Sequence, residues 1–202
     1  MLFRSTRAYI EGQVRGEAMA RHEWLTAESC AGLLALSGGR QGDVGRAMVS
    51  GNNELAAASL RRWLVVFGDR YYLELIRTER AGEEELVRQS LLMAAEFKVA
   101  VVASNDVRFL QRDGYNSHEA RVCIHDGRGL ADVDRPRNYS DKQYLRSPEE
   151  MAELFADIPS ALRNTVEIAR RCNLDLQLGG SVLPEFPVPD GDRKSTRLNS
   201  SH

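Results

Sequence analysis

The stretch VAVVASNDVRFLQRDG (residues 99–114) sets a run of small and β-branched residues directly before an Asn-Asp pair and an arginine. Such a run predicts a buried strand from Val99 to Ala103. Parallel α/β folds place their functional groups where such strands end, at the carboxyl edge of the sheet. Asn105, Asp106 and Arg108 therefore mark either a metal or catalytic site or a structural cluster in the same place.

Strands and helices alternate in the sequence ahead of this stretch. Two more apolar runs predict strands at residues 32–37 and 71–76. Helices are predicted at residues 4–15, 23–29, 43–50, 53–67 and 83–97. Strands separated by connections of this length pair in parallel through right-handed crossovers. The sequence therefore predicts an α/β fold, as part of a βα barrel or of a doubly wound sheet.

The apolar spacing within the longer helices predicts which side chains reach the core. On the helices at 53–67 and 83–97 these are Leu55, Ala58, Leu60, Trp63, Leu86, Leu91, Leu92 and Ala95. On a later helix that starts at Pro159 they are Leu162, Val166, Ile168 and Ala169. We expect the sheet to be covered by these faces.

The second half of the chain is less regular. A helix is expected at residues 117–125, followed by a polar surface loop at 127–144. Ser147 and Glu150 have the spacing of a capping box, which predicts that another helix begins there. A final short strand is expected at residues 174–178.

The composition is that of a soluble globular protein, with 43% hydrophobic and 28% charged residues. No apolar run approaches the roughly 20 residues of a membrane helix. The first residues lack the apolar segment of a secretory signal. The three cysteines are isolated, which suits a reducing cytoplasm and argues against a disulfide framework or a CxxC zinc site. We therefore expect a cytoplasmic protein with no membrane partner.

Residues 193–202 do not continue the pattern that precedes them. The sequence RKSTRLNSSH has no hydrophobic period and resembles translated sequencing-adapter read-through, so it is interpreted as an artefact. Without Arg193, Lys194 and Arg197 the 27 basic residues fall to 24, against 29 acidic residues, a net charge of −5. An acidic body binds nucleic acid poorly through charge alone.

Two carboxylates on the predicted strands are candidates for chemistry. Asp106 can bind a divalent metal or act as a base, or it can cap a turn and the next short helix, which its spacing favours. Glu74 lies inside an apolar strand, where a carboxylate is rarely buried without a partner. It can act as a ligand at the site or pair with Arg77 or Arg108, and both alternatives stay open.

Weaker candidates lie elsewhere in the chain. His118 and His125 are seven residues apart and could share a zinc ion, although a hydrogen-bonded or surface pair is favoured. The glycine-rich link at residues 38–45 could admit an anion to a helix end. It lacks the lysine and the glycine spacing of a P-loop, so a tight turn is favoured.

Arginines gather near tyrosines in the predicted loop. Arg135, Arg137 and Arg146 surround Tyr139 and Tyr144 in the sequence. Such a group can stack on nucleic acid or form a solvated or partner-facing surface. The acidic balance of the chain favours the second interpretation.

Four segments resemble one protein family in order and almost without gaps. They are LLALSGGRQGDVGRAM (33–48), DRYYLELIRTER (69–80), VVASNDVRFL (101–110) and the long stretch from SHEARVCIHDG to PEFPVPDG (117–191). The similarity is to the alpha subunits of bacterial DNA polymerase III and covers about residues 4–191. It falls in the second half of their N-terminal PHP (polymerase and histidinol phosphatase) domain.

The resemblance implies a partial, distorted βα barrel of the PHP type, second half only, and a helical segment leading to a polymerase core. Residues 1–178 would be the PHP part, 179–192 a linker toward the core, and 193–202 the adapter-derived tail. The front metal ligands of the PHP domain and the polymerase acids that bind Mg²⁺ for nucleotidyl transfer would lie outside this sequence. The fragment alone is therefore expected to be inactive, although its parent would be a DNA-directed DNA polymerase.

One late ligand pair of the family, Asp-x-His after a strand, has its counterpart in Asp106-Val107-Arg108. Asp106 matches and Arg108 departs. An imidazole donates a lone pair to a metal, whereas a guanidinium has none and is always cationic. We therefore expect Arg108 to pair with Asp106 or Glu74, and the three residues to form a vestigial site without Zn²⁺ or Mn²⁺.

With such a site, the resemblance implies that the PHP domain is a structural platform for a separate proofreading exonuclease subunit. Other replicase subunits would be further partners, and DNA would be bound through the polymerase core. The alternative is a working metal-dependent phosphoesterase of the PHP superfamily, with Asp106 as a metal ligand.

Overall fold

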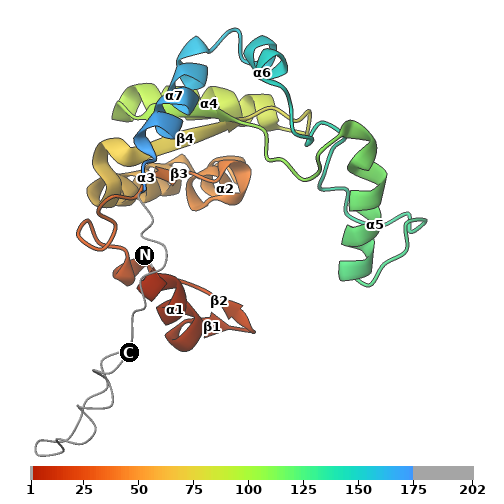
Figure 1. The fold of residues 1–202 in the computed structure, drawn as a ribbon, viewed down its shortest axis with the longest axis horizontal. Coiled ribbons are helices and arrows are strands. Elements are labelled where there is room, and N and C mark those ends of the chain that lie inside the picture. Colours follow the sequence, from red (N-terminus) through yellow and green to blue (C-terminus); the bar gives the residue numbers. More distant parts are fainter. Residues whose placement is uncertain (1, 175–202) are drawn as a thin grey trace, which may run out of the picture. The chain divides into compact units, whose positions relative to one another are not determined.

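The computed structural model describes residues 2–174, and Figure 1 shows the arrangement of their helices and strands. The centre is a parallel sheet in the order β3 (Ala35–Leu36), β4 (Tyr71–Ile76) and β5 (Ala100–Ser104). Ala35 pairs with Tyr71, and Tyr72 pairs with Ala100. This confirms the α/β class and the parallel pairing. Closure into a barrel is not seen among these residues, so the partial barrel stays a prediction.

Seven α-helices are formed by the described residues. They are α1 (Leu2–Glu11), α2 (Asp43–Val49), α3 (Asn53–Phe67), α4 (Glu83–Phe97), α5 (Tyr115–His125), α6 (Pro148–Leu154) and α7 (Pro159–Arg171). The short 3₁₀ turns are η1 (His22–Trp24), η2 (Gly39–Gln41), η3 (Gly68–Arg70) and η4 (Arg112–Gly114). The bounds of α3, α4 and β4 are those predicted from the sequence.

Near the amino terminus one predicted helix forms only in part, and a second does not form. The expected helix at 4–15 ends at Glu11, because Arg15 and Gly16 take positive φ angles of 54° and 85°. These two residues turn an antiparallel hairpin of β1 (Gln13–Val14) and β2 (Glu17–Ala18). The expected helix at 23–29 is replaced by η1 and turns, because the Thr26 and Ser29 hydroxyls each accept the other residue's backbone N–H.

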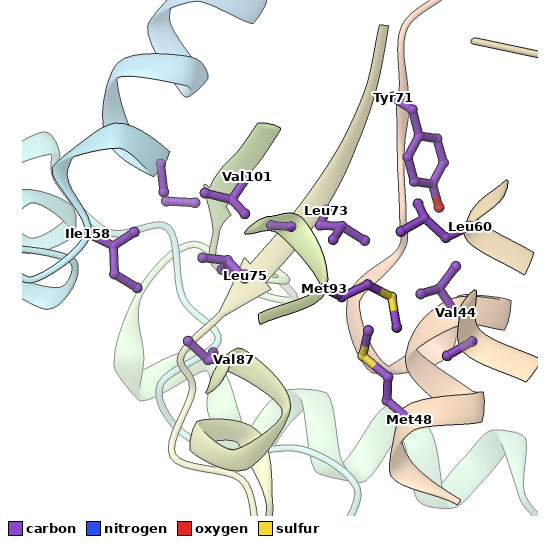
Figure 2. Packing of buried hydrophobic residues seen from close by; sticks show 14 of the residues in the cluster. Val44, Met48, Leu60, Tyr71, Leu73, Leu75, Val87, Met93, Val101 and Ile158 are labelled. Atoms are coloured by element: carbon purple, nitrogen blue, oxygen red, sulfur yellow. The ribbon is translucent and has the colours of Figure 1, made fainter. Parts of the chain in front are cut away.

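The core lies between the sheet and the helices that follow its strands. Figure 2 shows Leu73 and Leu75 of β4 among side chains from the covering elements. In the same view Met48 of α2 and Met93 of α4 point toward each other. Burying these side chains supplies the main favourable free energy of the fold.

Several residues expected in this core are exposed. They are Leu55, Ala58, Leu92, Ala95, Val166 and Ala169. In α3 and α4 apolar residues occupy much of the helix circumference, so the spacing leaves the buried face undecided. The faces that pack are centred instead on Ala56 and Leu60 in α3 and on Val87 and Ala94 in α4.

Helix α7 covers the outer edge of β5 with polar side chains. Asn164 Nδ2 donates to the Val101 carbonyl at 2.8 Å, and the Thr165 hydroxyl is shared between the Ala103 carbonyl at 3.2 Å and the Ala161 carbonyl of its own helix at 3.0 Å. Both carbonyls would otherwise be unpaired at a sheet edge. The packed face of α7 is partly polar. The prediction that Val166 lies on the buried side of this helix is therefore wrong.

The segment between α5 and α7 has largely the structure that the sequence predicts. Residues 127–144 contain no helix, and the capping box of Ser147 and Glu150 begins α6. The strand expected at 174–178 lies outside the described residues beyond Leu174, as do the linker and the tail. Among residues 2–174, no helix has the length and apolar character needed to cross a membrane.

Candidate functional site

The polar residues after β5 meet those after β4 in a cluster of charges. Asp106 Oδ1 lies 2.8 Å from Arg108 Nη2, and Asp106 Oδ2 lies 3.1 Å from Arg80 Nη1. Gln143 Nε2, from the loop before α6, donates to Asp106 Oδ2 at 2.9 Å. Arg80, Glu83, Asp106, Arg108 and Gln143 are called the strand-end cluster below. Its two acids and two arginines balance in charge.

The backbone at Asp106 is held in an unusual conformation. Its φ is 43°, a left-handed value that aspartate tolerates better than most residues. Gln143 Nε2 also donates to the Asp106 carbonyl at 3.1 Å, and the Gln143 carbonyl accepts the Arg108 N–H at 2.8 Å. The prediction that Asp106 caps a short helix is wrong, because η4 begins only at Arg112. The carboxylate binds the two guanidinium groups instead.

Glu83 anchors the other end of the cluster. Its carboxylate accepts the Thr78 N–H at 2.6 Å, the Thr78 hydroxyl at 2.7 Å and Arg80 Nε at 2.7 Å. The side chains of Arg80 and Glu83 are 7% and 5% exposed, so this ion pair is buried. The acid also stands in the first turn of α4, where the helix dipole favours a negative charge.

Glu74 does not join the cluster. Within the part of the chain that the structure describes, its half-buried carboxylate makes no ion pair. Arg108 pairs with Asp106, and Arg77 pairs with Asp157 at 2.6 Å and with Glu84 at 3.1 Å. The predicted pairing of Glu74 with Arg77 or Arg108 is therefore wrong, whereas the pairing of Arg108 with Asp106 is confirmed.

The histidines of α5 do not meet. His118 is buried, and its ring packs edge-on against Tyr139 with a centroid distance of 4.6 Å. Burial and the charge of Arg121 lower the pKa of His118 below its usual value. His125 is exposed and lies 2.9 Å from Asp126. The two rings have separate structural partners, which the sequence analysis favoured over a shared zinc ion.

The loop arginines hold the segment between α5 and α6. Arg135 pairs with buried Glu119 of α5, and Arg146 Nε donates to Asn105 Oδ1 at 3.2 Å. The Asn105 amide in turn donates to the carbonyls of Lys142 and Tyr144. These contacts place Gln143 over the end of β5.

The strand-end cluster does not fit a divalent metal. Among residues 2–174 no group of three or more His, Cys, Asp or Glu side chains is arranged to hold one. Both oxygens of Asp106 already face cationic guanidinium groups, which would repel a metal ion. The cluster can fix the loops at the strand ends, but it does not offer the open coordination position that metal catalysis needs.

Sequence reasoning found Asp106 and Arg108 but missed Arg80, Glu83 and Gln143. Glu83 stands in a run of three glutamates at the predicted start of a helix, where an acid is expected without any distant partner. Gln143 lies 37 residues from Asp106 in a loop without periodicity. No local pattern marks such long-range partners.

Comparison with known proteins gives a consistent set of relatives. Residues 2–78 match the PHP domain. The chain is 48% identical over 186 residues to DNA polymerase III subunit alpha of Pseudomonas fluorescens and 49% identical over 185 residues to that of Escherichia coli K12. The Vibrio cholerae subunit is 48% identical over 183 residues. These alignments cover 91–92% of this chain but 16% of each relative.

Proposed function

We propose that this chain, which carries PHP-domain sequence and is a homologue of part of DNA polymerase III subunit alpha, is a structural region of a bacterial replicative polymerase. The parent activity would be DNA-templated DNA synthesis, a nucleotidyl transfer assisted by Mg²⁺ at acids outside this sequence. The chain spans about one sixth of the relatives it matches, so the activity of the whole polymerase is part of the proposal.

The observation that carries the structural role is the state of Asp106. Its carboxylate is engaged by Arg80, Arg108 and Gln143. Both oxygens of this carboxylate already face guanidinium groups, and these neighbouring positive charges raise the free energy of any cation there. This argues against the alternative function, a metal-dependent phosphoesterase, because Arg108 would have to leave before the metal could bind.

We infer further that the region is a platform for a proofreading exonuclease subunit. A polymerase region without hydrolytic chemistry at its strand ends needs a separate subunit to remove mismatched nucleotides. The rigid ion-paired loops after β4 and β5 support this role, since a docking surface binds more tightly when it is already ordered. A replicative enzyme of this kind would work in the cytoplasm with other replicase subunits.

The decisive experiment measures metal content and phosphoesterase activity of the full chain. We expect the purified protein to contain less than one zinc or manganese ion per chain. We also expect it not to hydrolyse a simple phosphomonoester when either metal is added. Metal binding and hydrolysis that both disappear in Asp106→Ala would overturn the structural role. The control is Asp126→Ala, which removes an exposed carboxylate whose partner, His125, lies outside the strand-end cluster.

The platform role is tested separately by mixing the full chain with the 3′–5′ exonuclease subunit of the same genome. Co-elution in size-exclusion chromatography at micromolar concentration supports the proposal. Absence of association under the same conditions contradicts it.

A further inference from the structure

A groove of about 520 Å³ opens between α3 and α4. Met48 of α2 and Met93 of α4 are buried and point toward each other (Figure 2), so their side chains form its floor. Its rims carry charged and apolar side chains of the two helices, which include Glu54, Arg61, Leu92 and Glu96. The groove shares no residue with the strand-end cluster and is a separate feature of the fold.

Apolar side chains continue from the groove onto the outer surface of both helices. Leu92 of α4 is 60% exposed, and Val65 of α3 is 81% exposed. Exposed Ala58 stands seven residues before Val65, so both lie on one side of α3, with Arg61 between them. Since α3 and α4 also bury an apolar face against the core, they are apolar on two sides, which is typical of helices that are covered on both. The outer surface therefore indicates a partner.

Three charged side chains on this surface have no partner of opposite charge. Glu54, Arg61 and Glu96 are exposed, and none of them forms an ion pair or a side-chain hydrogen bond with any residue that the structure describes. The guanidinium carbon of Arg61 lies 5.0 Å from the centroid of the Phe97 ring, a contact that uses the face of the group and leaves its nitrogens for an acid. The surface thus offers free charges of both signs.

The mixture of charges decides between the possible partners. A nucleic acid binds surfaces with an excess of basic residues, whereas here two acids accompany one arginine. A second copy of the same surface meets the requirement. A two-fold contact sets each residue against a different residue of the other copy and repeats that pair once. Arg61 of each copy can then face Glu54 or Glu96 of the other, so the surface is complementary to itself.

From the exposed apolar side chains and the unpaired charges of both signs, we propose that the outer surface of α3 and α4 docks a second copy of this chain. Leu92 and Val65 supply the apolar contact, and the charges set the register, since exposed ion pairs contribute specificity more than affinity. This proposal does not depend on the polymerase role.

The size of the surface predicts how tightly the copies associate. Each helix has 15 residues. Two such helices, each about 22 Å long and about 10 Å wide, present an outer face of about 400 Å². A standard protein interface buries about 800 Å² per partner. We therefore expect a weak dimer that forms as the protein concentration rises.

The dimer is tested by sedimentation equilibrium of the full chain at micromolar to millimolar concentrations. The average mass should rise toward that of two chains. Arg61→Glu leaves three acids on the surface, and the double variant Glu54→Arg, Glu96→Arg leaves three arginines. Each variant alone should associate at least about tenfold more weakly than the wild type, because like charges then meet. Mixed in equal amounts, the two variants should associate with each other, since an acidic surface then meets a basic one.

The matched control is Arg163→Glu, which makes the same change of charge at an exposed position of α7. It should associate as the wild type does. Leu92→Ala removes the apolar contact without changing any charge and should weaken association at least about threefold. All these side chains are exposed, so thermal unfolding of the dilute variants should match that of the wild type, which excludes misfolding as the cause of lost association.

Three results would overturn the proposal. A wild-type chain that stays monomeric over the whole concentration range would leave the surface to a different protein. Association that Arg61→Glu weakens no more than Arg163→Glu does would place the contact between copies elsewhere on the molecule. Two charge variants that remain monomers when mixed would show that these charges do not face one another in the dimer.

Discussion

Arg108 Nη2 lies 2.8 Å from Asp106 Oδ1, so the first charged residues after β5 neutralise each other. Arg80 approaches the other oxygen of the same carboxylate at 3.1 Å. The end of the strand therefore holds an ion-paired network, with its own positive charges in the place where a metal ion would stand. A network of this kind ties the loops after β4 and β5 together.

Removing the carboxylate of Asp106 should destabilise the fold. Asp106→Asn leaves two guanidinium groups without their shared acid, one of them on the buried Arg80 side chain. We expect the free energy of unfolding to fall by about 2 kcal/mol, since breaking a buried pair is more costly than breaking a surface pair. Asp106→Ala should cost about 1 kcal/mol more, because alanine tolerates the φ of 43° poorly.

Both values can be measured by urea denaturation. Asp126→Asn serves as the control, because its partner His125 is exposed, and it should change stability by less than about 0.5 kcal/mol. If Asp106→Asn cost no more than this control, the network would contribute little to stability.

The side chains that α7 offers to β5 should stabilise the sheet edge. Asn164→Ala and Thr165→Val each remove the donor for one strand carbonyl, at Val101 and Ala103. Each change should lower the free energy of unfolding by about 1 kcal/mol, the usual net value of a hydrogen bond in a partly buried position. Thermal or urea unfolding measures the loss, and Val166→Ala on the exposed side of α7 should be nearly neutral.

The double variant should also associate with itself. With both donors absent, the outer edge of β5 presents unpaired carbonyls that can pair with another strand. Light scattering after size-exclusion chromatography should detect the larger species. A monomeric double variant of unchanged stability would mean that α7 covers the edge without these two bonds.

The regular part of the fold was predictable because its signals are local. The strand Tyr71–Ile76 is a continuous apolar and aromatic run, and the helices Asn53–Phe67 and Glu83–Phe97 combine apolar spacing with clear starts. The buried faces were less predictable. Leu92 fits an apolar stripe as well as Met93 does, and only the position of the sheet decides that Met93 is the buried one.

The same distinction applies to the candidate site. Asp106 and Arg108 are two residues apart, and their ion pair was one of the two pairings that the sequence left open for Arg108. Arg80 and Gln143 come from other loops, 26 and 37 residues away, and only the fold brings them to the same carboxylate. Glu74 is the opposite case. Its place on a strand near the site suggested an ion pair with an arginine, but it forms none among the described residues.

His118 should give the stability of the protein a measurable pH dependence. Burial first, and then the charge of Arg121, hold the pKa of His118 below its usual value of about 6.5. The groups that face its ring are Phe109, Tyr139, Arg121, Arg108 and Glu119. Because the folded pKa is depressed, the unfolded chain takes up the proton first as the pH falls.

The stabilising contribution of neutral His118 is thus complete above about pH 6.5 and is lost as the pH falls through the folded pKa. Urea midpoints of the wild type should decrease from about pH 7.5 to about pH 5. His118→Gln should show a smaller decrease, whereas His125→Gln, which alters an exposed ring, should follow the wild type. An equal decrease in His118→Gln and the wild type would exclude His118 as the source.

Gly45 should control the stability of the contact between η2 and α2. A Cβ at this position would lie 1.9 Å from the Gly39 carbonyl oxygen and 3.0 Å from the Arg40 Cα. These are backbone atoms, so they cannot move aside as a flexible side chain can. Gly45→Ala should therefore push η2 away from α2 and lower the free energy of unfolding by about 2 kcal/mol, as overpacking does.

Gly129→Ala is the control, because its Cβ meets only the Asp132 side chain, at 3.2 Å. Urea denaturation of the two variants measures the loss of stability. If Gly45→Ala were as stable as Gly129→Ala, η2 would move away from α2 at no cost, and the close approach of these two elements would contribute nothing to stability.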